Sequence, residues 1–171
     1  MSTKFFTNST GNTLFDKFKG IAADMINFDS FLAVVGFFRS SGYFKLRKEL
    51  GNVSEIKILV GINIDDIFRK HNKALLMLAD EDKAKEIYHN GFKEDIVNAQ
   101  YSPEVEEGIL QMCEDLVSGH LQMRIHATKN LHAKFYLCLP QNHSEHSDGW
   151  VIMGSSNISD SGLGIKQPPQ H

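Results

Sequence analysis

The chain of 171 residues carries a formal net charge of −3, and its 42% hydrophobic and 23% charged residues are ordinary for a single globular domain. This balance excludes a protein that is basic throughout, although nucleic acid needs only a local basic strip and is not excluded as a partner. The lack of a long apolar run, of a secretory signal and of more than two cysteines predicts a cytoplasmic protein without disulfides or a membrane partner.

The first part of the chain predicts an alternation of helices and strands. Apolar residues at helical spacing predict a helix over residues 14–26, with Thr13 as its N-cap. The continuous apolar run 31–38 predicts a strand buried on both faces, and a short helix is expected over 43–50. A β-branched run at 55–62 predicts the next strand, so this order favours a right-handed parallel crossover.

The second part predicts more helices and then a group of strands. Residues 65–79 and 81–90 have helical patterns, and Ser102-Pro103-Glu104 is a strong helix start with a cap, a first-turn proline and an acid. Three short β-favouring runs with short connections then predict neighbouring strands, antiparallel to one another. They cover residues 121–126, 131–139 and 150–153.

These elements predict an α/β fold, a mixed β-sheet flanked by helices. No internal repeat is found, so we expect one domain over residues 1–165. Residues 166–171 have the composition of a disordered tail, such as the end of a truncated protein would have.

Two motifs near the end of the chain contain side chains that can take part in catalysis. His132-Ala133-Lys134 opens one predicted strand, and Gly154-Ser155-Ser156-Asn157 follows the next. Residues two apart on a strand project from the same face, so His132 and Lys134 are expected to point together. An imidazole, an ammonium, and amide and hydroxyl donors at the ends of adjacent strands can attack and hold a phosphodiester without a metal.

The HxK triplet alone has little specificity. A second one, His71-Asn72-Lys73, occurs inside a helical pattern. The strand context and the GSxN loop distinguish the triplet at His132. The alternative interpretation is that Lys134 is a solvated strand residue and His132 a half-buried one without a chemical role.

Other candidate residues are less specific. Arg39 follows the first buried strand, where ligands commonly bind in parallel sheets, and Ser156 belongs to the GSxN loop, so both are candidate substrate-binding residues. His126 and Lys129 flank a turn, and an exposed turn explains them equally well. The run 143–148 holds closely spaced metal-ligating residues but has no partner pair at zinc spacing, so we expect a solvated loop and no metal.

The two motifs, with Ile158-Ser159 and Ser161-Gly162-Leu163 after them, resemble the motif of the phospholipase D superfamily. They are most similar to its nuclease-like branch, which includes metal-independent restriction endonucleases and domains fused to the N-terminus of bacterial helicases. The resemblance implies an α-β-α sandwich with phosphodiesterase activity and no cofactor. The longer family motif has an aspartate five residues after the lysine, and this chain has Leu139 there.

The expected mechanism follows from the groups. A neutral imidazole is a nucleophile at neutral pH, so His132 is expected to attack phosphorus and form a phosphohistidine. Lys134, Asn157 and Ser155 are expected to stabilise the developing charge. The leaving oxygen needs a proton from the opposite side, and the resemblance implies a second HxK-GSxN unit as its source. Here only another subunit can provide that unit, so a symmetric homodimer is expected.

The sequence therefore predicts a metal-independent endonuclease acting on DNA in a restriction or helicase system. The first alternative is a nucleic-acid-binding module that grips the backbone through the same residues and guides a fused or associated helicase. The second alternative is a lipid headgroup phosphodiesterase. It is less favoured because no segment resembles a membrane-facing apolar helix.

Overall fold

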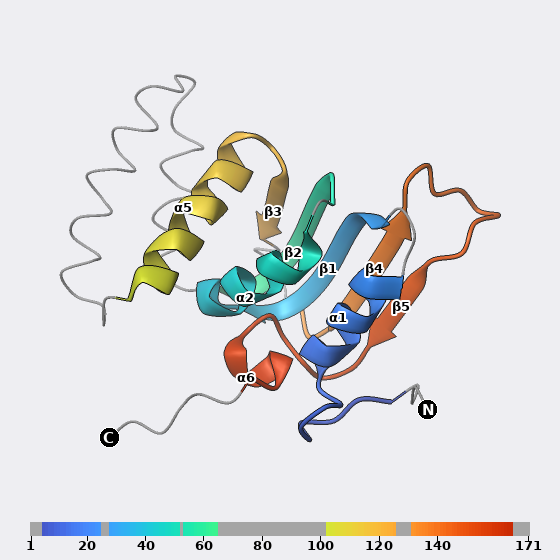
Figure 1. Ribbon diagram of the computed structural model, residues 1–171, viewed down its shortest axis with the longest axis horizontal. Coiled ribbons are helices and arrows are strands. Elements are labelled where there is room, and N and C mark those ends of the chain that lie inside the picture. Colours follow the sequence, from blue (N-terminus) through green and yellow to red (C-terminus); the bar gives the residue numbers. More distant parts are fainter. Residues whose placement is uncertain (1–4, 25–27, 52, 65–101, 126–130, 166–171) are drawn as a thin grey trace.

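The computed structural model describes residues 5–24, 28–51, 53–64, 102–125 and 131–165 (Figure 1). The helices expected over 65–79 and 81–90, the triplet His71-Asn72-Lys73 and the tail 166–171 lie outside these residues. So do His126 and Lys129.

A five-stranded mixed sheet forms the centre of the described part. Its strands are β1 (Phe28–Phe38), β2 (Glu55–Ile64), β3 (Leu121–Ile125), β4 (Phe135–Pro140) and β5 (Trp150–Met153). Their order across the sheet is β3-β2-β1-β4-β5. The β3-β2 and β2-β1 pairs are parallel, whereas the β1-β4 and β4-β5 pairs are antiparallel. The predicted α/β fold with a mixed sheet is confirmed.

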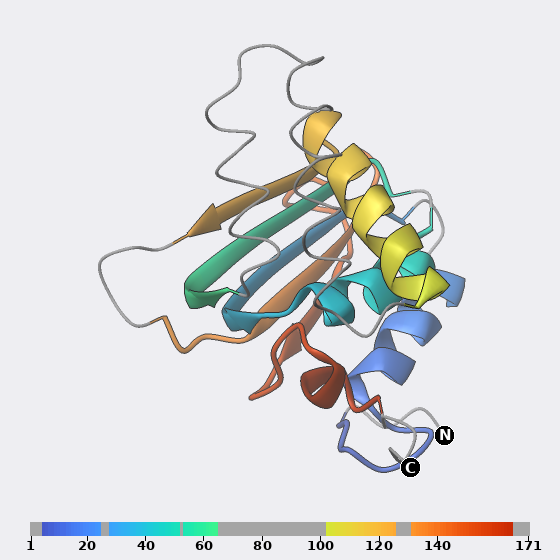
Figure 2. The same cartoon turned by 90° about the vertical axis from the view of Figure 1, so that its left-hand side faces the viewer.

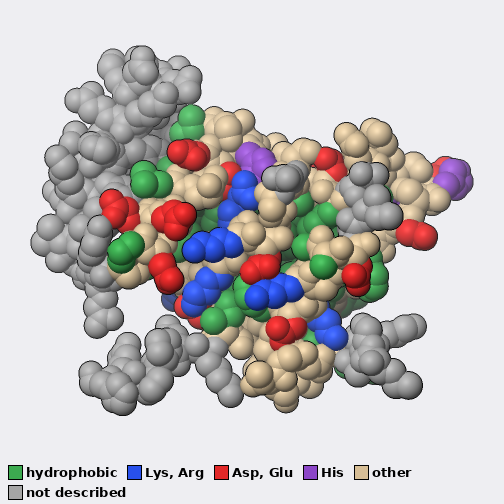
Figure 3. Space-filling model, in the orientation of Figure 1, with side chains coloured by type: hydrophobic (Ala, Val, Ile, Leu, Met, Phe, Trp, Pro, Cys, Tyr) green, Lys and Arg blue, Asp and Glu red, His purple; other side chains and the backbone are tan. Residues whose placement is uncertain are grey.

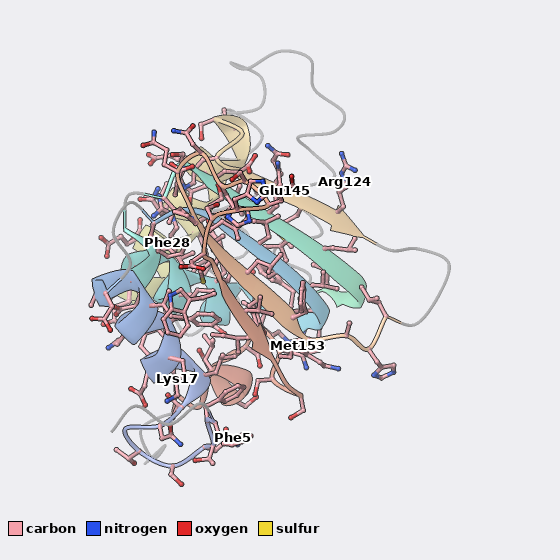
Figure 4. The ribbon with its side chains drawn as sticks, turned by 90° about the vertical axis from the view of Figure 1, so that its right-hand side faces the viewer. Phe5, Lys17, Phe28, Arg124, Glu145 and Met153 are labelled. Carbon is pink, nitrogen blue, oxygen red and sulfur yellow. The ribbon has the colours of Figure 1, made fainter. Side chains whose placement is uncertain are left out.

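The arrangement of the last three strands differs from the prediction. β3 is not a neighbour of β4. It pairs with β2 in parallel, at the edge opposite β5. Arg124 of β3 and Met153 of β5 accordingly lie at opposite edges of the sheet (Figure 4). Only β4 and β5 form the antiparallel pair that the short connections predicted.

The described helices lie on one side of the sheet (Figures 1 and 2). They are α1 (Leu14–Asp24), α2 (Ser40–Leu50), α5 (Pro103–Val117) and the short α6 (Asp160–Leu163). The predicted N-cap of α1 is confirmed. Asp16 N–H donates to the Thr13 hydroxyl at 3.1 Å, and the Asp16 carboxylate accepts from Thr13 N–H at 2.8 Å. Ser102 likewise caps α5 by accepting from Val105 N–H.

The core lies between this helical layer and one face of the sheet. Along β1 the buried residues alternate, with Phe31, Ala33 and Val35 inside. The prediction that this strand is buried on both faces is wrong for Leu32 and Val34, which are half-buried. No described helix packs on that second face.

The second face of the sheet is largely apolar where β1, β4 and β5 form it. A shallow hollow of about 410 Å³ lies on it. Leu32, Val34, Leu59, Phe135 and Leu137 line the hollow together with Lys57, Gln122 and Arg124.

Charges are mixed on the helix-covered side of the molecule (Figure 3). Lysines there pair with acids, as in Lys19–Glu49 at 3.5 Å and Lys45–Asp160 at 3.1 Å. This side is therefore not the local basic strip that nucleic acid requires. Cys113 and Cys138 are buried and unbonded to each other, and burial raises the pKa of the Cys138 thiol to about 12.

Candidate functional site

The HxK triplet lies in the segment that leads into β4, not in the strand itself. The expected strand over 131–139 begins only at Phe135. Ahead of it the chain crosses the carboxyl ends of β1 and β2. A Cβ atom on Gly36 would lie 2.7 Å from the Leu131 carbonyl oxygen, and one on Gly61 would lie 3.1 Å from the same atom. Two glycines thus allow this segment to approach the sheet closely.

Lys134 is half-buried above the end of β1. Its Nζ donates a hydrogen bond to the carbonyl oxygen of His132 at 2.7 Å. The same Nζ would lie 3.4 Å from a Cβ atom on Gly36. The ammonium therefore lies beside the carboxyl end of the central strand, with one of its three N–H groups engaged by the backbone.

His132 is exposed, and its Cα would lie 3.7 Å from the same Cβ position on Gly36. Its backbone is thus at the end of β1, next to the Lys134 ammonium. The imidazole makes no hydrogen bond with any residue that the structure describes. The direction in which the ring points toward a substrate therefore stays a prediction.

The loop after β5 returns to the same end of β1. Phe38 forms a parallel bridge with Ile158, and Arg39 N–H donates to the Ile158 carbonyl at 2.8 Å. This docking brings Asn157 next to Phe37. Asn157 Oδ1 accepts the hydrogen bond of Phe37 N–H at 3.0 Å. Because a backbone N–H needs an acceptor, this bond fixes the amide orientation and leaves Nδ2 as a donor toward a ligand.

Lys134 and Asn157 therefore lie next to consecutive residues of β1, Gly36 and Phe37. They come from the two motifs, which lie on either side of the β4-β5 hairpin. The HxK backbone and the GSxN amide lie at the same end of the sheet. An ammonium and a carboxamide at this position provide hydrogen-bond donors for an anion.

Three further predicted residues are Ser155, Ser156 and Arg39. Ser155 is exposed, and its hydroxyl makes no hydrogen bond within the described part of the chain. The Ser156 carbonyl accepts from the Tyr136 hydroxyl at 2.6 Å. Arg39 occupies the N-cap position of α2 without a side-chain cap, and its guanidinium stacks on the Phe37 ring at 4.0 Å from the centroid.

Sequence reasoning did not identify Tyr136, Gly36 or Gly61 as residues of the site. The two glycines had a usable signal, because glycine inside an apolar strand often marks a close backbone approach. Tyr136 had none, since an aromatic residue in a strand is ordinary core composition.

Leu139, which replaces the aspartate of the longer motif, is remote from Lys134. It pairs with Ser30 near the other end of β1. Five residues of extended chain correspond to roughly 17 Å. A carboxylate at this position could not contact the Lys134 backbone region, so its absence leaves the local geometry of the candidate site unchanged.

The loop over 143–148 is largely exposed. Within it, Ser147 Oγ bonds to His143 Nδ1 at 2.9 Å and donates to the Ser144 carbonyl at 3.0 Å. Among the described residues, no group of three or more histidine, cysteine or acidic side chains is gathered as a metal would need. The loop is thus held by its own hydroxyl groups.

No protein-family model matches this sequence, and a search among curated proteins finds no match. The resemblance to the phospholipase D superfamily therefore stays a prediction that rests on the two motifs. None of the described helices is long and apolar enough to cross a membrane.

Proposed function

We propose that this protein is a metal-independent phosphodiesterase that cleaves DNA. His132 is the nucleophile, and Lys134, Asn157 and Ser155 bind the phosphate. The observation that carries the proposal is that the Lys134 ammonium and the Asn157 amide lie next to consecutive residues of β1, Gly36 and Phe37, and that the His132 backbone lies beside the same strand.

The reaction has two steps. In the first, a ring nitrogen of neutral His132 forms a bond to phosphorus while the bond from phosphorus to the leaving oxygen breaks. In the second, water attacks the phosphohistidine and releases the imidazole. Lys134 keeps two N–H groups for nonbridging oxygens, and Asn157 Nδ2 adds further donors. These fixed donors act on the charge that a metal would otherwise neutralise.

The leaving oxygen must receive a proton, which the attacking imidazole cannot supply. A second copy of the chain, related by a two-fold axis, would provide His132 of the other subunit as the acid. The proposed active species is therefore a homodimer with the catalytic site at the interface of the two subunits. The exposure of His132 is compatible with a position facing another subunit.

DNA is the proposed substrate, and a cytoplasmic restriction or helicase system is the proposed setting. Both come from the resemblance of the motifs. Arg39 supports an anionic polymer as the ligand, because its guanidinium is held on Phe37 beside the Asn157 contact. Such a stacked cation can contact a neighbouring phosphate.

The deciding experiment is a plasmid cleavage assay in excess EDTA, with His132→Ala as the matched variant. Wild-type cleavage that persists in EDTA and is lost in His132→Ala supports the mechanism. Cleavage that disappears with EDTA and returns with Mg²⁺ refutes it. In that case the 143–148 loop becomes the first candidate for a metal site.

A second candidate function is a nucleic-acid-binding module that guides a helicase. One observation favours it: Lys134 and Asn157 are held by hydrogen bonds, but no described residue orients the His132 ring. The Lys134 ammonium and the Asn157 amide, each fixed by a hydrogen bond, can bind a phosphate without catalysing its cleavage. A chain that binds DNA with salt-sensitive affinity, yet never cleaves it at any metal concentration, would establish this function instead.

A further inference from the structure

Tyr136 connects the two motifs from inside the core. It is the second residue of β4, two positions after Lys134, and is 1% exposed. Its ring packs edge-on against Phe18, with centroids 5.2 Å apart, and at a tilt against Phe31, with centroids 6.2 Å apart. From there its hydroxyl donates a 2.6 Å hydrogen bond to the carbonyl of Ser156 in the GSxN loop.

This hydrogen bond acts on the peptide group that precedes Asn157. The Ser156 carbonyl belongs to the peptide plane that enters Asn157, so fixing the oxygen restrains the rotation of that plane. The Asn157 side chain is fixed independently by Phe37 N–H at 3.0 Å. The residue is thus held at its backbone by β4 and at its amide by β1, and these two restraints together set the direction of Nδ2.

The hydroxyl is a dependable donor because it is buried among aromatic rings. Burial raises the pKa of the Tyr136 phenol well above its usual value, so the proton stays on the oxygen at neutral pH. A buried hydroxyl without a partner is costly, and Ser156 provides that partner.

We propose that Tyr136 is a positioning residue for the phosphodiester chemistry. Through Ser156 it fixes the Asn157 amide relative to the Lys134 ammonium, so that both donors act on the same phosphate. This inference rests on the proposed function and deepens it. Tyr136 itself is buried below the site and does not touch the substrate.

The GSxN loop has other anchors besides Tyr136. The loss of the Tyr136 hydroxyl can therefore change the position of Asn157 without unfolding the loop. Its end is held by the bridge between Phe38 and Ile158 and by Ser159, which caps α6 by accepting from Gly162 N–H. Removal of the Tyr136 hydroxyl leaves these anchors and the aromatic packing in place. The expected consequence is a local change in the Ser156–Asn157 peptide, not loss of the loop.

The test replaces Tyr136 by phenylalanine in the full chain and compares it with Tyr43→Phe. Tyr43 is the matched control, because it is fully buried and its hydroxyl also donates one strong hydrogen bond, to Asp115 at 2.7 Å. That bond lies between α2 and α5. Both variants lose one buried hydroxyl, but only the Tyr136 hydroxyl lies between the two motifs.

In the cleavage assay with EDTA, Tyr136→Phe is expected to lower kcat by about tenfold or more, with KM changed by less than about threefold. Tyr43→Phe is expected to keep both parameters near the wild-type values even if its melting temperature falls equally. Equal effects of the two variants on kcat would overturn the inference, because they would show a general stability effect.

A second readout does not require turnover, so failure of the proposed function is distinguishable from failure of this inference. The Asn157 side-chain amide is followed by nitrogen–proton NMR spectra, assigned through Asn157→Asp. Its signals should move in Tyr136→Phe and stay in place in Tyr43→Phe. Unmoved signals in Tyr136→Phe refute the positioning role, even for a wild-type protein that only binds DNA.

Discussion

Replacing Gly36 by alanine introduces one methyl group at the point where the HxK segment crosses the sheet. The new Cβ would lie 2.7 Å from the Leu131 carbonyl oxygen and 3.4 Å from Lys134 Nζ. The first distance is too short for any real contact, and it involves backbone that cannot simply rotate away. The segment carrying His132 must therefore move.

The size of the movement follows from these distances. Ordinary contact begins at 3.4 Å, so the carbonyl must retreat by about 0.7 Å, the difference between 3.4 and 2.7 Å. Overpacking of this kind typically costs about 1–3 kcal/mol of stability. A misplacement on the order of 1 Å costs about a hundredfold in rate, so we expect cleavage to fall by roughly ten- to a hundredfold.

The assay measures cleavage in EDTA and urea unfolding on the same preparations. Gly20→Ala is the control, because a Cβ at that helical position meets nothing within 4 Å. It should keep the activity and slightly increase the stability, since alanine favours a helix. Wild-type activity in Gly36→Ala, at undiminished stability, would refute the close approach of the HxK segment to β1.

Four further outcomes are expected. Lys134→Ala should weaken both DNA binding and cleavage, and the binding of the variant should show a smaller salt dependence in titrations at several salt concentrations. Sedimentation at micromolar concentration should show a two-fold dimer, and a strict monomer would count against turnover but not against binding. Asp115→Ala should lower the free energy of unfolding by about 1–3 kcal/mol in urea titrations, because the half-buried Arg47 guanidinium, 2.8 Å from that carboxylate, and the buried Tyr43 hydroxyl both lose a partner. Hydrogen bonds from Thr13 hold the pKa of the Asp16 carboxyl below its ordinary value, so Asp16 stabilises the fold at neutral pH and loses this contribution as the pH falls through its folded pKa. Urea titrations of Asp16→Asn should accordingly differ from wild type at pH 7 and converge with it in acid.

The elements that local chemistry determines could be predicted from the sequence. Thr13 and Ser102 cap their helices as expected, and Gly51 ends α2 with a positive φ of 53°. Each of these signals depends on residues within one turn of the chain. The neighbours of β3 could not be predicted, because pairing with β2 at the far edge depends on contacts between distant segments.

The same distinction applies to the site. Its residues could be selected from the motifs, since His132, Lys134 and Asn157 carry recognisable groups at defined spacing. The residues that surround them could not be predicted from the sequence. The partner of Asn157 is a backbone N–H, which every residue except proline has, so no residue type marks Phe37 as that partner. The early start expected for β4 was wrong for a related reason: residues 131–134 have a strand composition, but their path is set by the glycines that they cross.

The bond between Phe37 and Asn157 joins residues 120 positions apart, and it has a consequence for the order of folding. β1, α2 and β2 are close in sequence and can associate early, whereas the donors of the site meet only after the loop behind β5 docks on β1. During synthesis, which proceeds from the N-terminus, a chain that has not yet reached Asn157 has Lys134 but not the second donor, the Asn157 amide. Under the proposed function, the phosphate site would thus form only after the loop behind β5 docks on β1, and a variant that stops at Met153 should bind DNA more weakly than the full chain in a binding titration.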